Sequence, residues 1–166
     1  MPRRKEPTPW VLLCYRMPRE PSTPRIGIWR QLERLGVARL GDGLVGLPAD
    51  AATREQIDWI AEEVRRADGT ATVWLATAAS TADEAGIVDG MRTARAAEYQ
   101  GVIDKAEAAA TTDPDERMRA LRQLREELRR IARRDFFPPS QRDRAKAAVE
   151  ALILDARAPG KRARVR

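Results

Sequence analysis

The sequence contains no histidine and a single cysteine, Cys14. Histidine is the commonest general base and the commonest metal ligand, so its absence removes the usual routes to acid–base catalysis and metal binding. One cysteine allows neither a disulfide framework nor a four-cysteine metal site. Because Cys14 lies in an apolar stretch, we predict a buried, unreactive thiol. We therefore expect a protein that is not an enzyme, with no catalytic residues, no cofactor and no metal.

Long apolar segments and phosphate-binding glycine loops are missing as well. No hydrophobic run approaches the roughly 20 residues that a membrane span requires, so we expect no membrane partner. The basic N-terminus leads to Pro7 and Pro9 rather than to an apolar segment with a cleavage site, which predicts no secretory signal and a cytoplasmic protein. Gly41 and Gly43 stand too close together for a nucleotide-binding fingerprint and indicate a hairpin instead.

Charge is abundant and unevenly distributed. Residues 1–48 carry a net charge of +5, residues 49–110 carry −6, and residues 111–166 carry +7. Two explanations stay open. The basic ends contact nucleic acid, or oppositely charged faces attract each other within the fold or across a dimer.

The apolar pattern predicts a βαββαβ order across residues 10–77. Trp10–Arg16 is apolar on both faces and indicates a central strand. Thr23 and Thr53 are the expected N-caps of two helices, and Gly36 is expected to end the first. The expected fold class is α+β, a ferredoxin-like βαββαβ sandwich followed by a C-terminal helical appendage. Both helices then cover one face of an antiparallel sheet, and the other face needs a partner subunit or the rest of the chain.

The remainder of the sequence is helical, with starts near Asp83, Asp113 and Ser140. Arg95 falls on the apolar line of the first of these helices. It either extends towards solvent or points into a polar pocket, and we expect the first. The expected organisation is a disordered basic N-terminus at 1–8, a ferredoxin-like domain at 9–80, the helical appendage at 81–156 and a disordered basic tail at 157–166.

Four arginines gather around the predicted passage from the first strand to the first helix. Arg16 closes the strand, Arg19 lies in the loop, Arg25 stands in the first helical turn and Arg30 follows on the same helix. The unpaired N–H groups of a helix start and the rigid donors of arginine suit a phosphate or an oxyanion. We therefore select these four arginines as the candidate anion-binding site.

A structural explanation of the arginines remains open. Glu20 is close enough in sequence to pair with Arg16, Arg19 or Arg25, and Glu33 is close enough to pair with Arg30. Such arginine–carboxylate pairs are common in surface loops.

The four tryptophans could stack on nucleic-acid bases, but their positions favour packing. Trp29 belongs to the apolar stripe of the first helix together with Ile28 and Leu32. Trp59 and Trp74 fall off the predicted apolar faces, which favours packing on the C-terminal helices or at a dimer interface.

Several segments of the chain resemble the N-terminal domain of ChrB proteins, bacterial regulators linked to chromate resistance. They are Tyr15-Arg16-x-Pro18-Arg19-Glu20-Pro21-Ser22, Leu35-Gly36, Leu47-Pro48, Trp59–Glu63, Ala71–Leu75 and Arg130–Phe137. More distantly, the βαββαβ unit is similar to the Cas2-like domain of PaaX-type repressors. Cas2-type proteins include metal-dependent nucleases with an acidic residue near the first strand. The strand Trp10–Arg16 has no carboxylate to hold Mg²⁺, which excludes that activity.

The resemblance implies a cytoplasmic regulator that responds to chromate and acts on DNA as a homodimer. One departure is that ChrB proteins carry a second, C-terminal domain, for which this sequence leaves no room. We carry two hypotheses. In the first, the arginines and the basic tail bind DNA phosphates. In the second, the protein is a dimeric interaction or sensor module that binds chromate, another oxyanion or a protein partner instead of DNA.

Overall fold

The computed structural model describes residues 8–157. The predicted disordered segments therefore lie outside the described residues, apart from residues 8 and 157. Within α3, between Met91 and Arg92, the chain divides into a first and a second unit. The elements in chain order are β1 (Trp10–Arg16), α1 (Ser22–Leu35), β2 (Ala38–Gly41), β3 (Leu44–Pro48), α2 (Ala51–Arg66), β4 (Thr70–Ala76), α3 (Thr81–Ala110), α4 (Pro114–Ala132) and α5 (Gln141–Arg157).

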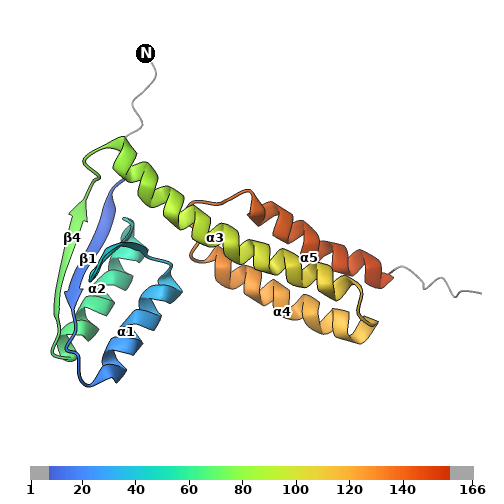
Figure 1. Ribbon diagram of the computed structural model, residues 1–166, viewed down its shortest axis with the longest axis horizontal. Coiled ribbons are helices and arrows are strands. Elements are labelled where there is room, and N and C mark those ends of the chain that lie inside the picture. Colours follow the sequence, from blue (N-terminus) through green and yellow to red (C-terminus); the bar gives the residue numbers. More distant parts are fainter. Residues whose placement is uncertain (1–7, 158–166) are drawn as a thin grey trace, which may run out of the picture. The chain divides into compact units, whose positions relative to one another are not determined.

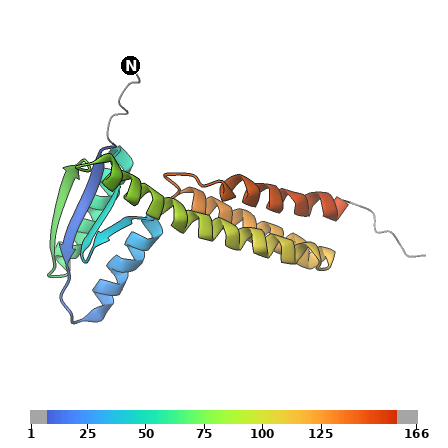
Figure 2. The same cartoon turned by 45° about the horizontal axis from the view of Figure 1, so that its top comes forward.

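The first unit is the ferredoxin-like sandwich that the sequence predicts. Its antiparallel sheet has the strand order β2-β3-β1-β4, so β1 is central as expected. Helices α1 and α2 lie on the same face of this sheet (Figures 1 and 2). Register follows from β1, where Leu13 stands opposite both Val45 and Val73. The core beneath the helices contains Val11, Leu13, Ile28, Leu32, Val45, Leu47, Ile57, Ile60, Ala61 and Val64.

The starts of α1 and α2 differ from the sequence prediction. Helix α1 begins at Ser22, one residue after its N-cap Pro21, so Thr23 is already inside the helix. Helix α2 has Asp50 as its N-cap, and Thr53 completes a capping box from the third helical position. Thr53 is buried, and its hydroxyl donates to the carbonyl of Pro48 at 2.6 Å. This hydrogen bond holds Thr53 at the third helical position. The predicted end at Gly36 is confirmed, with φ at 70°.

The sheet face opposite the helices carries the side chains that alternate with the core. Cys14 is exposed on this face, so the prediction of a buried thiol is wrong. Leu13 and Tyr15 point to the helix side, and strand geometry then turns Cys14 away from it. Trp74, on the edge strand β4, is 57% exposed. Strand β4 contains no charged residue, proline or glycine.

The second unit is a helical assembly of α4, α5 and the part of α3 from Arg92 onwards. Its core contains Tyr99, Val102, Ile103, Ala106, Ala109, Leu121, Leu124, Ile131, Ala145, Val149 and Leu152. The predicted start of α4 is confirmed, because Asp113 accepts hydrogen bonds from the backbone of Asp115 and Glu116. Met118, on the same helix, is exposed. Among residues 8–157, no helix is both long enough and apolar enough to cross a membrane.

A polar cluster joins α3 to the segment after α4. The Tyr99 hydroxyl donates to Asp135 at 2.9 Å, and Arg134 pairs with Glu98. Glu98 also pairs with Arg95 at 3.1 Å, and only 12% of the Arg95 side chain is exposed. The expectation that Arg95 extends towards solvent is therefore wrong. A carboxylate one helical turn away keeps the guanidinium group inside the cluster.

Candidate functional site

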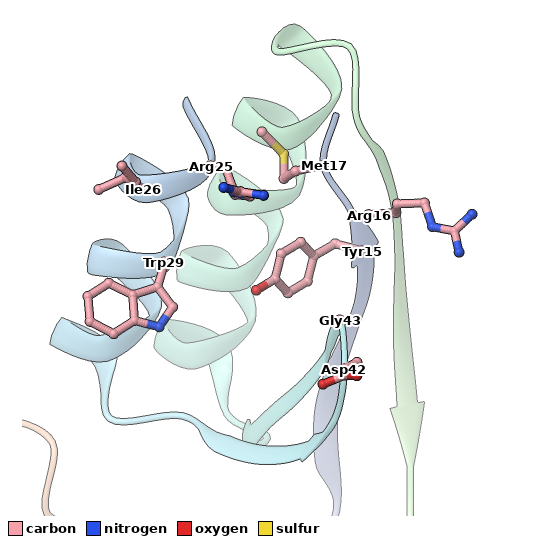
Figure 3. Close-up of a pocket in the computed structure, with 8 residues that line it drawn as sticks. All are labelled: Tyr15, Arg16, Met17, Arg25, Ile26, Trp29, Asp42 and Gly43. Carbon is pink, nitrogen blue, oxygen red and sulfur yellow. The ribbon is translucent and has the colours of Figure 1, made fainter. Parts of the chain in front are cut away.

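A pocket of about 470 Å³ opens in the first unit where β1, α1 and the β2–β3 turn meet (Figure 3). The pocket is lined by the end of β1 and the residue after it, by the first two turns of α1, and by the two central residues of the β2–β3 turn. The lining residues are Tyr15, Arg16, Met17, Arg25, Ile26, Trp29, Asp42 and Gly43. The site is therefore built at the passage from strand to helix that the sequence singled out.

The start of α1 lies beside this pocket, with Arg25 and Ile26 in the lining. Among the described residues, no side chain caps the helix, and its first turn contains no acidic residue. Pro21 and Pro24 have no N–H, so Ser22 and Thr23 supply the free N–H groups of this helix start, and neither residue lines the pocket. An anion in the pocket would therefore be stabilised by Arg25 and by the positive end of the helix dipole rather than by backbone hydrogen bonds.

The structure does not bring the four predicted arginines together. Arg25 points to the same side of β1 as Tyr15 and Trp29, whereas Arg16 points away from that group (Figure 3). Tyr15 and Arg16 are consecutive in a strand, so their side chains leave on opposite faces. Arg19 and Arg30 do not line the pocket. Of the four, Arg25 alone presents its cation to the pocket beside the helix start.

The carboxylates proposed as structural partners do not pair with these arginines. Glu33 pairs with Arg39 at 2.6 Å rather than with Arg30. Glu20, Arg16 and Arg25 form no ion pair with any residue between 8 and 157. The structural explanation therefore does not account for Arg25, and its cation is available to a ligand.

Trp29 was expected in the buried stripe of α1, but it is 47% exposed and lines the pocket. Ile28 and Leu32 fill the buried stripe, and Trp29 lies outside it. The guanidinium carbon of Arg39 lies 5.8 Å from the centre of the Trp29 ring, within range of a cation–π contact. The spacing between Arg25 and Trp29, four residues apart on one helix, was the sequence signal that could have placed both at one site.

Tyr15 brings a titratable hydroxyl to the pocket. Burial raises the pKa of Tyr15, and the positive charge of Arg39 opposes that rise. Burial and the hydrogen bond to Asp135 raise the pKa of Tyr99 more strongly, so the two tyrosines of the chain should titrate separately, Tyr15 first.

Replacing Arg39 by glutamine should raise the pKa of Tyr15 further, because the charge that favours the phenolate is removed. We expect the first tyrosinate absorbance step in an alkaline titration to move to higher pH in Arg39→Gln. Arg34→Gln, on the same sandwich but outside the pocket, should leave that step in place. A step that stays fixed in both variants would show that Arg39 does not act on Tyr15.

The polar groups of the site are mostly hydrogen-bond donors. Arg25 and the Tyr15 hydroxyl offer donors, while Asp42 lies in the turn on the other side (Figure 3). Within the described part of the chain, no three histidine, cysteine, aspartate or glutamate side chains gather as a metal site would require. Sequence reasoning missed six members of the site, which are Tyr15, Met17, Ile26, Trp29, Asp42 and Gly43.

Comparisons with known proteins identify the family of this chain. The family described as "Protein ChrB, N-terminal" matches residues 25–112, just over half of the chain. Protein ChrB of Cupriavidus metallidurans is 28% identical over 157 residues, which cover 88% of this chain and 48% of the relative. The chain thus spans about half the length of that curated relative. No solved structure matches the chain. The protein belongs to the family of ChrB N-terminal domains.

Proposed function

We propose that the protein is a regulatory protein of chromate resistance and that its first unit binds a tetrahedral oxyanion at the start of α1. The anion is chromate or a phosphate of DNA, and both present oxygen acceptors to a guanidinium group. Membership of the ChrB family supports the link to chromate resistance. The proposed role is binding without catalysis, in the cytoplasm.

The observation that carries the proposal is the unbalanced positive charge at the start of α1. Arg25 lies in a helical turn without an acidic residue, and it forms no ion pair with any described residue. A cation at a helix start is unfavourable unless an anion compensates for it. The pocket beside Arg25 provides the space for that anion, and the Tyr15 hydroxyl adds a further donor. Asp42 disfavours negative charge on the opposite side, so we place the anion against α1.

The first test is calorimetric melting with chromate, sulfate or phosphate, against sodium chloride of equal ionic strength. An oxyanion at about ten times its dissociation constant stabilises the folded state by about 1.4 kcal/mol, which corresponds to roughly 6–11 °C for a domain of this size. We expect Arg25→Gln to lose most of this shift and Arg34→Gln, on the same helix but outside the pocket, to keep it. The absence of a saturable shift in the unmodified protein would contradict oxyanion binding.

The second test separates a DNA phosphate from a free oxyanion. The protein is titrated with the duplex upstream of its own gene at two salt concentrations, with and without chromate. If Arg25 contacts a phosphate, Arg25→Gln should reduce the slope of log K against log salt concentration by about 0.9. A response to oxyanions alone would identify a sensor module that does not bind DNA through this site. If Arg25→Gln behaves like the unmodified protein in both tests, the proposal is overturned.

We also propose that the protein acts as a homodimer. Cys14 and Trp74 are exposed on the sheet face opposite α1 and α2, and this supports a second copy as its cover. Sedimentation equilibrium over a range of concentrations measures the mass directly. A monomer throughout that range would contradict the proposal.

A further inference from the structure

Helix α4 has a strongly basic exposed face that the proposed oxyanion site does not use. Successive residues of a helix are turned by about 100°, so positions 119, 122, 126, 130 and 133 follow one line along α4 and its C-cap. Arginine occupies every position on this line except 126, which is glutamate. The buried residues Leu121, Leu124 and Ile131 lie on the opposite side. Arg129 lies directly beside this line. We call Arg119, Arg122, Arg129, Arg130 and Arg133 the arginine face of α4; all five are exposed.

Neighbouring carboxylates neutralise only part of this face. Glu126 pairs with Arg129 at 3.1 Å and with Arg133 at 3.7 Å, so one negative charge serves two arginines. Arg119, Arg122 and Arg130 form no ion pair with any residue the structure describes. The face therefore keeps an excess of positive charge, held on a helix whose other side is fixed in the core of the second unit.

We propose that the arginine face of α4 binds the phosphate backbone of duplex DNA. Arg119 and Arg133 are separated by about 21 Å along the helix axis at 1.5 Å per residue. That length corresponds to about six base pairs of duplex at 3.4 Å each. A row of guanidinium groups on a rigid helix is complementary in charge to such a row of phosphates. The proposal rests on the regulatory function proposed above and adds the surface that holds the DNA.

The structure favours DNA over a membrane surface as the partner. A helix that lies on a bilayer inserts its apolar face between the lipids. The apolar face of α4 is already buried, since Leu121, Leu124 and Ile131 are each at most 3% exposed. Contacts with phosphates carry no sequence information by themselves, so this face should bind duplexes of different sequence about equally.

The test compares two triple variants of the full chain that change the net charge equally. R119Q/R122Q/R130Q removes the arginines of the face that lack an ion pair, and R34Q/R54Q/R66Q removes exposed arginines of the first unit. Binding to a fluorescent duplex of about 30 base pairs, in the upstream sequence and in a scrambled one, is followed by anisotropy at several salt concentrations. We expect the α4 variant to bind both duplexes about 10- to 50-fold more weakly near 0.1 M salt, with the salt slope reduced by about 2.7.

The control variant should lose less than about threefold, and R119K/R122K/R130K should restore most of the binding because it restores the charge. Glutamine and arginine have similar helix propensity, so the helical circular dichroism should be unchanged in all three. Equal losses in the α4 variant and the control, or a loss of binding to anionic vesicles without a loss of binding to DNA, would overturn the proposal.

The oxyanion melt separates this inference from the proposed function. The α4 variant should keep the oxyanion shift, because Arg25 and the pocket are unchanged. If the α4 variant loses DNA while Arg25→Gln affects neither oxyanion nor DNA, the arginine face stands and the oxyanion site falls. If Arg25→Gln loses the oxyanion shift while the α4 variant binds DNA as the control does, the oxyanion site is supported and the arginine face is ruled out as the DNA-binding surface.

Discussion

Replacing Gly43 by alanine should destabilise the first unit by about 3 kcal/mol, from the sum of a strained backbone conformation and a steric clash. Gly43 has φ at 71°, in the left-handed region that other residues adopt at a cost. A Cβ atom there would lie 2.3 Å from the carbonyl oxygen of Tyr15. Because that oxygen belongs to the central strand, the hairpin would have to move and would strain the hydrogen bond from Tyr15 N to Gly43 O, which is 2.7 Å long.

Gly41 provides the control in the same hairpin. A Cβ atom at Gly41 meets nothing within 4 Å, so Gly41→Ala should change stability by less than about 0.5 kcal/mol. All four tryptophans lie in the first unit, so their fluorescence in urea reports on it alone. Gly43→Ala should lower the midpoint by roughly 1–3 M. Equal midpoints for the two variants would show that the turn does not hold the pocket wall against β1.

Replacing Tyr99 by alanine should destabilise the second unit by about 4 kcal/mol, the cost of emptying a large buried aromatic site. Tyr99 is 1% exposed and belongs to the core that α3 shares with α4 and α5. Its hydroxyl is also the donor to Asp135 Oδ2, and the other oxygen of that carboxylate, Oδ1, is buried without a hydrogen-bond partner among the described residues. The substitution therefore removes packing and a hydrogen bond together.

Tyr99→Phe separates the two contributions. The ring stays and the hydroxyl is lost, so we expect a cost of about 1.5–2 kcal/mol, typical of a hydrogen bond to a charged group. Because the second unit contains no tryptophan, its unfolding is followed by helical circular dichroism. An alanine variant no less stable than the phenylalanine variant would show that the packing of Tyr99 contributes nothing.

The order of the elements could be predicted because it depends on local pattern. Alternation in β4, the helical stripes, and Gly36 at its positive φ each act within a few residues. The helix starts were harder, because capping residues compete. Thr53 looked like an N-cap, but its hydroxyl is engaged by the carbonyl of Pro48, and Asp50 takes the N-cap position.

The burial of individual side chains could be predicted less well. Trp29 and Cys14 are apolar residues next to core positions, and apolar character alone does not say on which side of an element a residue falls. Leu75 lies on the same strand face as Val73 but is 62% exposed, because β4 is the edge strand. Strand order, which decides this, is a property of the whole sheet.

The location of the candidate site could be predicted from the sequence, but most of the residues that line it could not. The passage from β1 to α1 does form a pocket, and Arg25 faces it. The grouping of Arg16 with Arg25 ignored the alternation of the strand, which sends Tyr15 into the pocket and Arg16 away from it (Figure 3). Asp42 and Gly43 reach the site through the pairing of β3 with β1, a contact between segments that sequence spacing does not reveal.

Strand β4 has a consequence for how the protein behaves in concentrated solution. Its outer edge pairs with no other strand of the described sheet, and Arg65 covers one of its carbonyls, at Ala71. Edge strands in natural proteins usually carry a lysine, a proline or a bulge that blocks edge-to-edge aggregation, and β4 carries no lysine or proline. Aggregation of this protein, when it occurs, should therefore begin at β4, and a partner or a second copy that pairs with this edge would act as its protective cover.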